Sequence, residues 1–119
     1  MAQTMDIAAT YQRGFDLRCE GRYSEAKSEF QTVLATDASH VDAQWQMGLI
    51  QGFEGDFDGS LATLRVLVAK NPGHLNARYD LAMTAMMLGE VDEACGHFKH
   101  ILAVNPDHEK AKQQIQYCP

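Results

Sequence analysis

The strongest concentration of metal-ligand side chains lies near position 97. Cys95, His97 and His100 carry the thiol and imidazole groups that bind zinc in many proteins. Residues two apart on a helix point to different faces, so Cys95 and His97 do not converge. Only His97 and His100 share a face, and a pair is fewer than the three or four protein ligands that zinc takes. We therefore expect no metal site, and we expect both histidines on a solvated helix face.

Nucleophilic and acid–base chemistry has equally little support. Cys19 stands near Glu20 and Glu25, and negative neighbours disfavour a reactive thiolate. The sequence contains no phosphate-cradling glycine loop, no HExxH pair and no strand-borne nucleophile. The acidic pair Asp92 and Glu93 stands where a helix is expected to begin, and the helix dipole favours negative charge there. The sequence predicts no catalytic residue, no cofactor and no enzyme activity.

Composition narrows the classes of partner. The chain has 119 residues, which suits one small domain, and its net charge of −6 repels a phosphate backbone. No apolar run approaches the length of a bilayer span, and the first residues lack a secretion signal. The three cysteines, Cys19, Cys95 and Cys118, have no CxxC spacing, which predicts free thiols in a reducing compartment. We expect a cytoplasmic protein that binds no nucleic acid and does not insert into a membrane.

The elements that position these side chains repeat every 34 residues. The shift aligns glycines, small residues, large apolar residues and histidines, as in Gly21, Gly55 and Gly89; Gly14, Gly48 and Ala82; Ala26, Ser60 and Ala94; Phe30, Leu64 and Phe98; and His40, His74 and His108. Residues 1–119 therefore form one domain with units at 7–40, 41–74 and 75–108, followed by a partial unit at 109–117.

Each unit predicts two helices. The first runs over 6–20, 41–54 or 75–88 and ends at a glycine, which adopts the left-handed conformation without steric cost. The second ends before Pro72 and Pro106, and the three aligned histidines stand where the next helix begins. One helical hairpin cannot bury its own apolar face, so the units must stack and the partial unit must cap them. We expect an all-α solenoid of about seven helices.

This pattern resembles the tetratricopeptide repeat family. The family's unit has a small residue at position 8, glycine near 15, an aromatic at 17, alanine at 20, an aromatic at 24 and proline at 32, and the match covers residues 7–117. One departure is position 4, often a large aromatic in the family, which is Thr10, Gln44 and Arg78 here. The resemblance implies a right-handed superhelix whose first helices line a concave groove with positions 2, 5, 6, 9, 12 and 13.

Those groove positions carry mostly aromatic and methionine side chains, which suit an extended apolar peptide or an amphipathic helix. Phe15 and Leu49 could equally pack between units. The candidate peptide-binding residues are Tyr11, Phe15, Trp45, Gln46, Leu49, Phe53, Asn76, Tyr79, Asp80, Met83, Met86 and Met87. We expect a non-enzymatic adaptor that binds a peptide or helix of a partner protein.

The resemblance also tests particular ligands. Family members that hold acidic C-terminal tails use cations and asparagines at clamp positions, which here carry Tyr11, Phe15, Gln46, Asn76 and Asp80. With no cation at those positions we expect no carboxylate clamp, and a basic or apolar ligand with Asp42 and Asp80 as partners for a lysine or arginine. Two alternatives remain: a self-assembling homo-oligomer that seats a neighbouring copy's terminal helix, and a small chaperone that shields a hydrophobic client segment.

Overall fold

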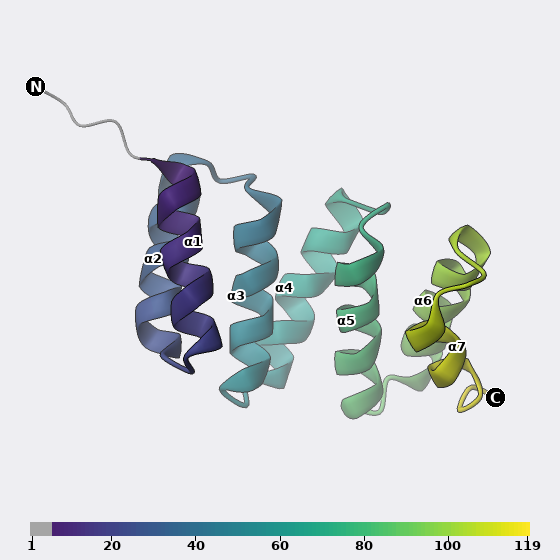
Figure 1. The fold of residues 1–119 in the computed structure, drawn as a ribbon. Coiled ribbons are helices and arrows are strands. Elements are labelled where there is room, and N and C mark those ends of the chain that lie inside the picture. Colours follow the sequence, from purple (N-terminus) through teal and green to yellow (C-terminus); the bar gives the residue numbers. More distant parts are fainter. Residues whose placement is uncertain (1–5) are drawn as a thin grey trace, which may run out of the picture.

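A computed structural model describes residues 6–119 of the chain. These residues form seven helices: α1 (Ile7–Cys19), α2 (Tyr23–Thr36), α3 (Val41–Phe53), α4 (Phe57–Lys70), α5 (Leu75–Met87), α6 (Val91–Val104) and α7 (Glu109–Ile115). Helices α1 and α7 lie at opposite ends of the stack (Figure 1). The molecule measures 59 × 27 × 21 Å, so it is elongated along the direction of stacking. The all-α solenoid predicted from the repeat is confirmed.

A side chain caps the first helix of every unit and α7. In each case it accepts a hydrogen bond from the backbone N–H three residues later, which satisfies a donor that has no partner inside the helix. The acceptor and donor residues are Asp6 and Ala9, His40 and Ala43, His74 and Ala77, and His108 and Ala111, at 3.0–3.1 Å. The three aligned histidines are therefore helix caps, as predicted.

The helix ends also follow the sequence. Gly21, Gly55 and Gly89 adopt positive φ angles of 77°, 87° and 81° in the turns between the helices of a unit. Helices α4 and α6 end at Lys70 and Val104, each two residues before a proline. None of the described helices is long and apolar enough to cross a membrane.

Small residues let the two helices of a unit approach closely. A Cβ atom added at Gly14 would lie 2.8 Å from Cε1 of Phe30, and one added at Gly48 would lie 2.9 Å from Cδ2 of Leu64. Both distances are shorter than van der Waals contact, and Phe30 and Leu64 are fully buried. These glycines therefore make room for the largest core side chains.

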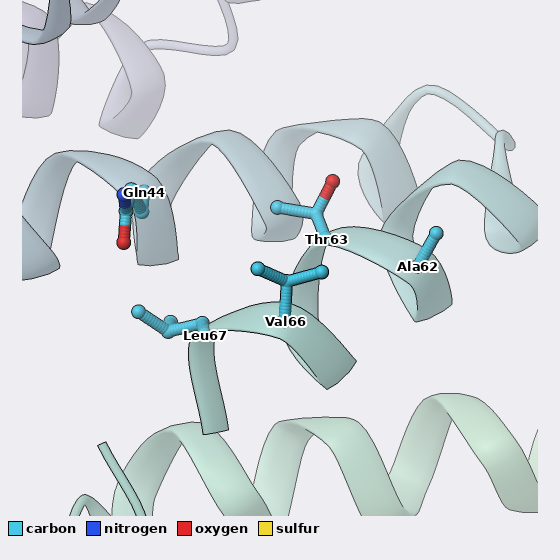
Figure 2. Close-up of a pocket in the computed structure, with 5 residues that line it drawn as sticks. All are labelled: Gln44, Ala62, Thr63, Val66 and Leu67. Carbon is cyan, nitrogen blue, oxygen red and sulfur yellow. The ribbon is translucent and has the colours of Figure 1, made fainter. Parts of the chain in front are cut away.

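A hollow lies between α3 and α4, beside Gln44 at position 4 of the second unit. The side-chain amide of Gln44 donates to the carbonyl oxygen of Ala38 at 2.8 Å, so it turns toward the preceding loop. A cavity of about 370 Å³ lies beside it, lined by Gln44, Ala62, Thr63, Val66 and Leu67 (Figure 2).

The cysteines differ from the prediction. Cys95 of α6 and Cys118, beyond α7, form a disulfide with their Cα atoms 5.8 Å apart, while Cys19 is a free and exposed thiol. The expectation of three free thiols is therefore wrong, because the chain turns back after α7 and brings Cys118 beside α6. Disulfides persist mainly in oxidising compartments, so the cytoplasmic location inferred from free thiols loses that support.

Candidate peptide-binding groove

The groove is built on the first helices of the units. Helix α3 contacts both α1 and α5, and α7 packs on α6 at the C-terminal end. In Figure 1 these first helices follow one another along the stack, with α2 and α4 behind them. Side chains on the same face of α3, α5 and α7 therefore line one continuous surface, which holds two pockets.

The first, which we call the apolar pocket, lies between α3, the start of α4 and α5. It has a volume of about 320 Å³ and is lined by Leu49, Gly52, Phe53, Phe57, Ser60, Asp80, Met83, Thr84 and Met87. Phe53 and Met87 are 52% and 63% exposed, which is unusual for side chains of this size. Exposed apolar side chains beside a hollow are typical of an interaction site.

The second, which we call the polar pocket, lies between α3, α5 and the start of α7. It has a volume of about 290 Å³ and is lined by Trp45, Asn76, Tyr79, Asp80, His108 and Lys110. The ammonium group of Lys110 lies 5.8 Å from the centre of the Tyr79 ring, within the range of a cation–π contact.

Asp80 is the residue common to the two pockets. Its Oδ2 accepts a hydrogen bond of 2.8 Å from the indole Nε1 of Trp45, which belongs to the neighbouring unit. Burial raises the pKa of Asp80 above its ordinary value, and the Trp45 hydrogen bond, Lys110 and His74 oppose that rise. His74 also contacts Trp45 edge-on, with ring centres 4.9 Å apart, and this contact helps to fix the indole ring.

The N-terminal end of the groove is aromatic. The guanidinium carbon of Arg18 lies 5.0 Å from the ring centre of Phe15 and 5.9 Å from that of Phe53. Tyr23 stacks on Phe53, with the two ring centres 5.7 Å apart. Arg18 therefore connects the aromatic residues of the first unit to the apolar pocket.

Most of the predicted groove residues line the two pockets. Eight of the twelve do so, namely Trp45, Asn76, Tyr79 and Asp80 in the polar pocket and Leu49, Phe53, Asp80, Met83 and Met87 in the apolar pocket. The remaining four are Tyr11, Phe15, Gln46 and Met86.

Those four residues lie outside both pockets for different reasons. Gln46 is only 3% exposed, so it is buried between units rather than open to a ligand. Tyr11 packs on Phe30 with ring centres 5.5 Å apart, and burial raises its pKa. Met86 is partly buried against the core, while Phe15 lies beside Tyr11 on α1.

The sequence analysis missed His108 and Lys110. Both come from the start of α7, which was expected only to cap the stack. Lys110 has the same register position as Asn76, so the 34-residue shift contains the signal that could have placed it in the groove. Asp42, the other carboxylate expected to meet a ligand, is exposed in the first turn of α3 and lines neither pocket.

The residues considered for metal binding take part in structural contacts. Nδ1 of His97 lies 3.0 Å from Nη1 of Arg78, and Nε2 lies 3.6 Å from a carboxylate oxygen of Glu93. The His97 side chain is only 19% exposed and burial lowers its pKa, so it does not lie on the solvated face that was predicted, whereas His100 is exposed as predicted. Within residues 6–119, no three histidine, cysteine, aspartate or glutamate side chains are grouped so that they could hold a metal ion.

Solved structures of three different proteins illustrate what this fold resembles. MamA residues 41 to the end from Desulfovibrio magneticus RS-1 is 22% identical with a TM-score of 0.82, and the match covers 94% of this chain and 63% of that one. The first tetratricopeptide domain of Spaghetti (RPAP3), bound to the HSP90 peptide SRMEEVD, is 15% identical with a TM-score of 0.86, covering 98% and 92%. The Yersinia enterocolitica type III secretion chaperone SycD, in complex with a peptide of the translocator YopD, is 14% identical with a TM-score of 0.84, covering 93% and 90%.

Sequence comparison gives the family. No curated protein matches the chain significantly. The family model described as a tetratricopeptide repeat matches residues 54–115, which is more than half of the sequence. With the three aligned units and the stacked helical pairs, this match means that the chain belongs to the tetratricopeptide repeat family.

Proposed function

We propose that this protein is a non-enzymatic module that binds an apolar or amphipathic segment of a partner protein in the groove formed by α3, α5 and α7. The observation that carries the proposal is the apolar pocket, where Phe53 and Met87 remain more than half exposed beside a hollow of about 320 Å³. Covering these side chains with an apolar segment removes them from water, which favours binding.

The similar structures support this proposal. The Spaghetti (RPAP3) domain and SycD are both in complex with peptides, and this chain spans 92% and 90% of their lengths. Because their sequence identity to this chain is low, their ligands do not indicate its ligand, which depends on the residues of its own groove. That groove has Asp80 at its centre, which disfavours an acidic tail as ligand.

The experiment is a selection from a random dodecapeptide library displayed on phage, followed by binding measurements with two matched variants. Met87→Glu places a charge at the apolar pocket, whereas Val104→Glu places the same charge at the end of α6, where the side chain lines neither pocket. Both native side chains are exposed, at 63% and 61%, so both variants are expected to fold. Met87→Glu should abolish binding of the selected peptides and Val104→Glu should not. Equal effects of the two variants, or no selected peptide, would contradict the proposal.

A second function is favoured by the SycD structure, which is that of a secretion chaperone. In this alternative the groove shields a hydrophobic segment of one client protein until the client is delivered. Co-expression with the chain should then raise the soluble yield of that client, and Met87→Glu should remove the increase. An adaptor would leave the yield of its partner unchanged.

Self-assembly stays a separate prediction, because the groove could seat the terminal helix of a neighbouring copy. Size-exclusion chromatography with light scattering at micromolar concentration decides it. A monomer is expected for an adaptor, and a dimer that Met87→Glu dissociates would favour self-assembly.

A further inference from the structure

Asp80 is an acidic side chain at the junction of the apolar and polar pockets. Its Oδ2 is occupied by the hydrogen bond from Trp45, and no hydrogen bond among residues 6–119 uses its Oδ1. The residue lines both pockets, so a ligand that spans the groove must cover it. The half-buried carboxylate has already lost part of its hydration, and a ligand would remove more.

A covered carboxylate oxygen needs a hydrogen-bond donor. An ionised acid that loses its water without gaining a partner is costly, and the cost opposes binding. A ligand with only apolar groups at this point would therefore bind poorly, and an acidic ligand would also be repelled. A lysine or arginine supplies both a donor and the opposite charge, which makes the strongest type of hydrogen bond.

No cationic side chain in the described part of the protein donates a hydrogen bond to the Asp80 carboxylate. Lys110 influences Asp80 electrostatically, but no ion pair joins the two in the described part of the chain, and its ammonium group lies over Tyr79. His74 uses Nδ1 to cap α5. Trp45 therefore holds the carboxylate in position while a face of it remains available to the groove.

We propose that Asp80 is the specificity-determining residue of the groove and selects a bound segment in which a lysine or arginine lies close to a large apolar residue. The cation donates to Asp80 while the apolar side chain enters the pocket formed around Leu49 and Met83. This inference rests on the proposed function and deepens it, because it names the chemistry of the ligand.

The test repeats the dodecapeptide selection on the native protein and two variants. Asp80→Asn keeps the shape of the side chain and an acceptor for Trp45 but removes the charge. Asp58→Asn is the matched control, since it removes the same charge from an exposed position at the start of α4. This control is needed because the net charge of −6 attracts basic peptides to the whole surface.

Native protein and Asp58→Asn should both select peptides in which lysine or arginine is enriched next to leucine, methionine or phenylalanine. Asp80→Asn should select peptides with the apolar residue alone. For the strongest peptide, replacing its cation by glutamine should weaken calorimetric binding to the native protein by about tenfold and leave binding to Asp80→Asn nearly unchanged.

The contrary results are distinct. Selected peptides that Met87→Glu no longer binds, but that show no enrichment of lysine or arginine, overturn the role of Asp80 and leave the proposed function intact. Equal loss of enrichment in Asp58→Asn and Asp80→Asn also overturns it, because the effect then comes from net charge. Failure to select any peptide overturns the proposed function and this inference together.

Discussion

At the scale of single residues, Asp80 accepts a hydrogen bond from Trp45 in a buried location that disfavours its charged form. Burial is the largest influence on its pKa and raises it, even though Trp45 donates a hydrogen bond to the ionised form. The folded state therefore disfavours the charged carboxylate relative to the unfolded chain. A carboxyl group whose charged form is disfavoured by burial, and which lines both pockets, is consistent with a role in binding.

The raised pKa of Asp80 predicts how Asp80→Asn changes the stability of the protein. Because the pKa of Asp80 is raised on folding, its carboxyl group contributes most to stability below the ordinary carboxyl pKa, and that contribution is lost as the pH rises through the folded value. The variant should therefore be at least as stable as the native protein at neutral pH, with its advantage shrinking toward pH about 3.5. Urea denaturation of the variant and the native protein at both pH values measures the difference in their stability. A loss of more than about 1 kcal/mol at neutral pH would show that the charged hydrogen bond to Trp45 outweighs burial.

At the scale of helices, close packing within a unit depends on glycine. Gly48 of α3 faces Leu64 of α4, and an added Cβ would lie 2.9 Å from Cδ2 of that leucine. Gly48→Ala should destabilise the protein by about 1–3 kcal/mol, because Leu64 is fully buried and has little room to move.

Gly96 is the control for that substitution. It lies on α6 with nothing within 4 Å of an added Cβ, so Gly96→Ala should stabilise the protein by about 0.5–1 kcal/mol through helix propensity. Chemical denaturation of both variants measures the difference. A Gly48→Ala protein as stable as Gly96→Ala would mean that α3 and α4 pack less closely than described.

The cap helix depends on its disulfide. Helix α7 has only 7 residues, too few for a helix to persist alone, and Cys118 ties the end of the chain to α6. Cys118→Ser should therefore increase hydrogen exchange over residues 109–115 far more than over α3, as should a dithiol reductant added to the native protein. Cys19→Ser should leave hydrogen exchange over residues 109–115 unchanged, because that thiol is exposed and forms no disulfide. Unchanged protection of α7 in Cys118→Ser would show that apolar packing around Ala111 is sufficient.

Much of this element structure could be predicted from the sequence. The glycines at the turns, the prolines after α4 and α6 and the histidine caps each act locally, so their register fixed where the helices begin and end. The Cys95–Cys118 bond could not be predicted in this way. It joins residues 23 apart in the sequence through the path of the chain beyond α7, which a repeat period does not describe.

At the scale of the whole molecule, the groove exists only where units meet. Trp45 and Asp80 are 35 residues apart in the sequence, and stacking brings them within hydrogen-bond distance. The repeat register predicted both as groove residues, but it could not show that Gln46 on the same helix as Trp45 is buried or that Lys110 lines the polar pocket. Those outcomes depend on side-chain packing between neighbouring units rather than on register.

Peptide binding in the groove is tested most directly by following three groove side chains during a titration. The NMR signals to record are the indole N–H of Trp45 and the methyl groups of Met83 and Met87, which belong to α3 and α5. With a peptide selected from the library, all three signals should shift together and saturate at the affinity measured by calorimetry. Saturable binding that leaves these three signals in place would show that the ligand site lies elsewhere on the molecule.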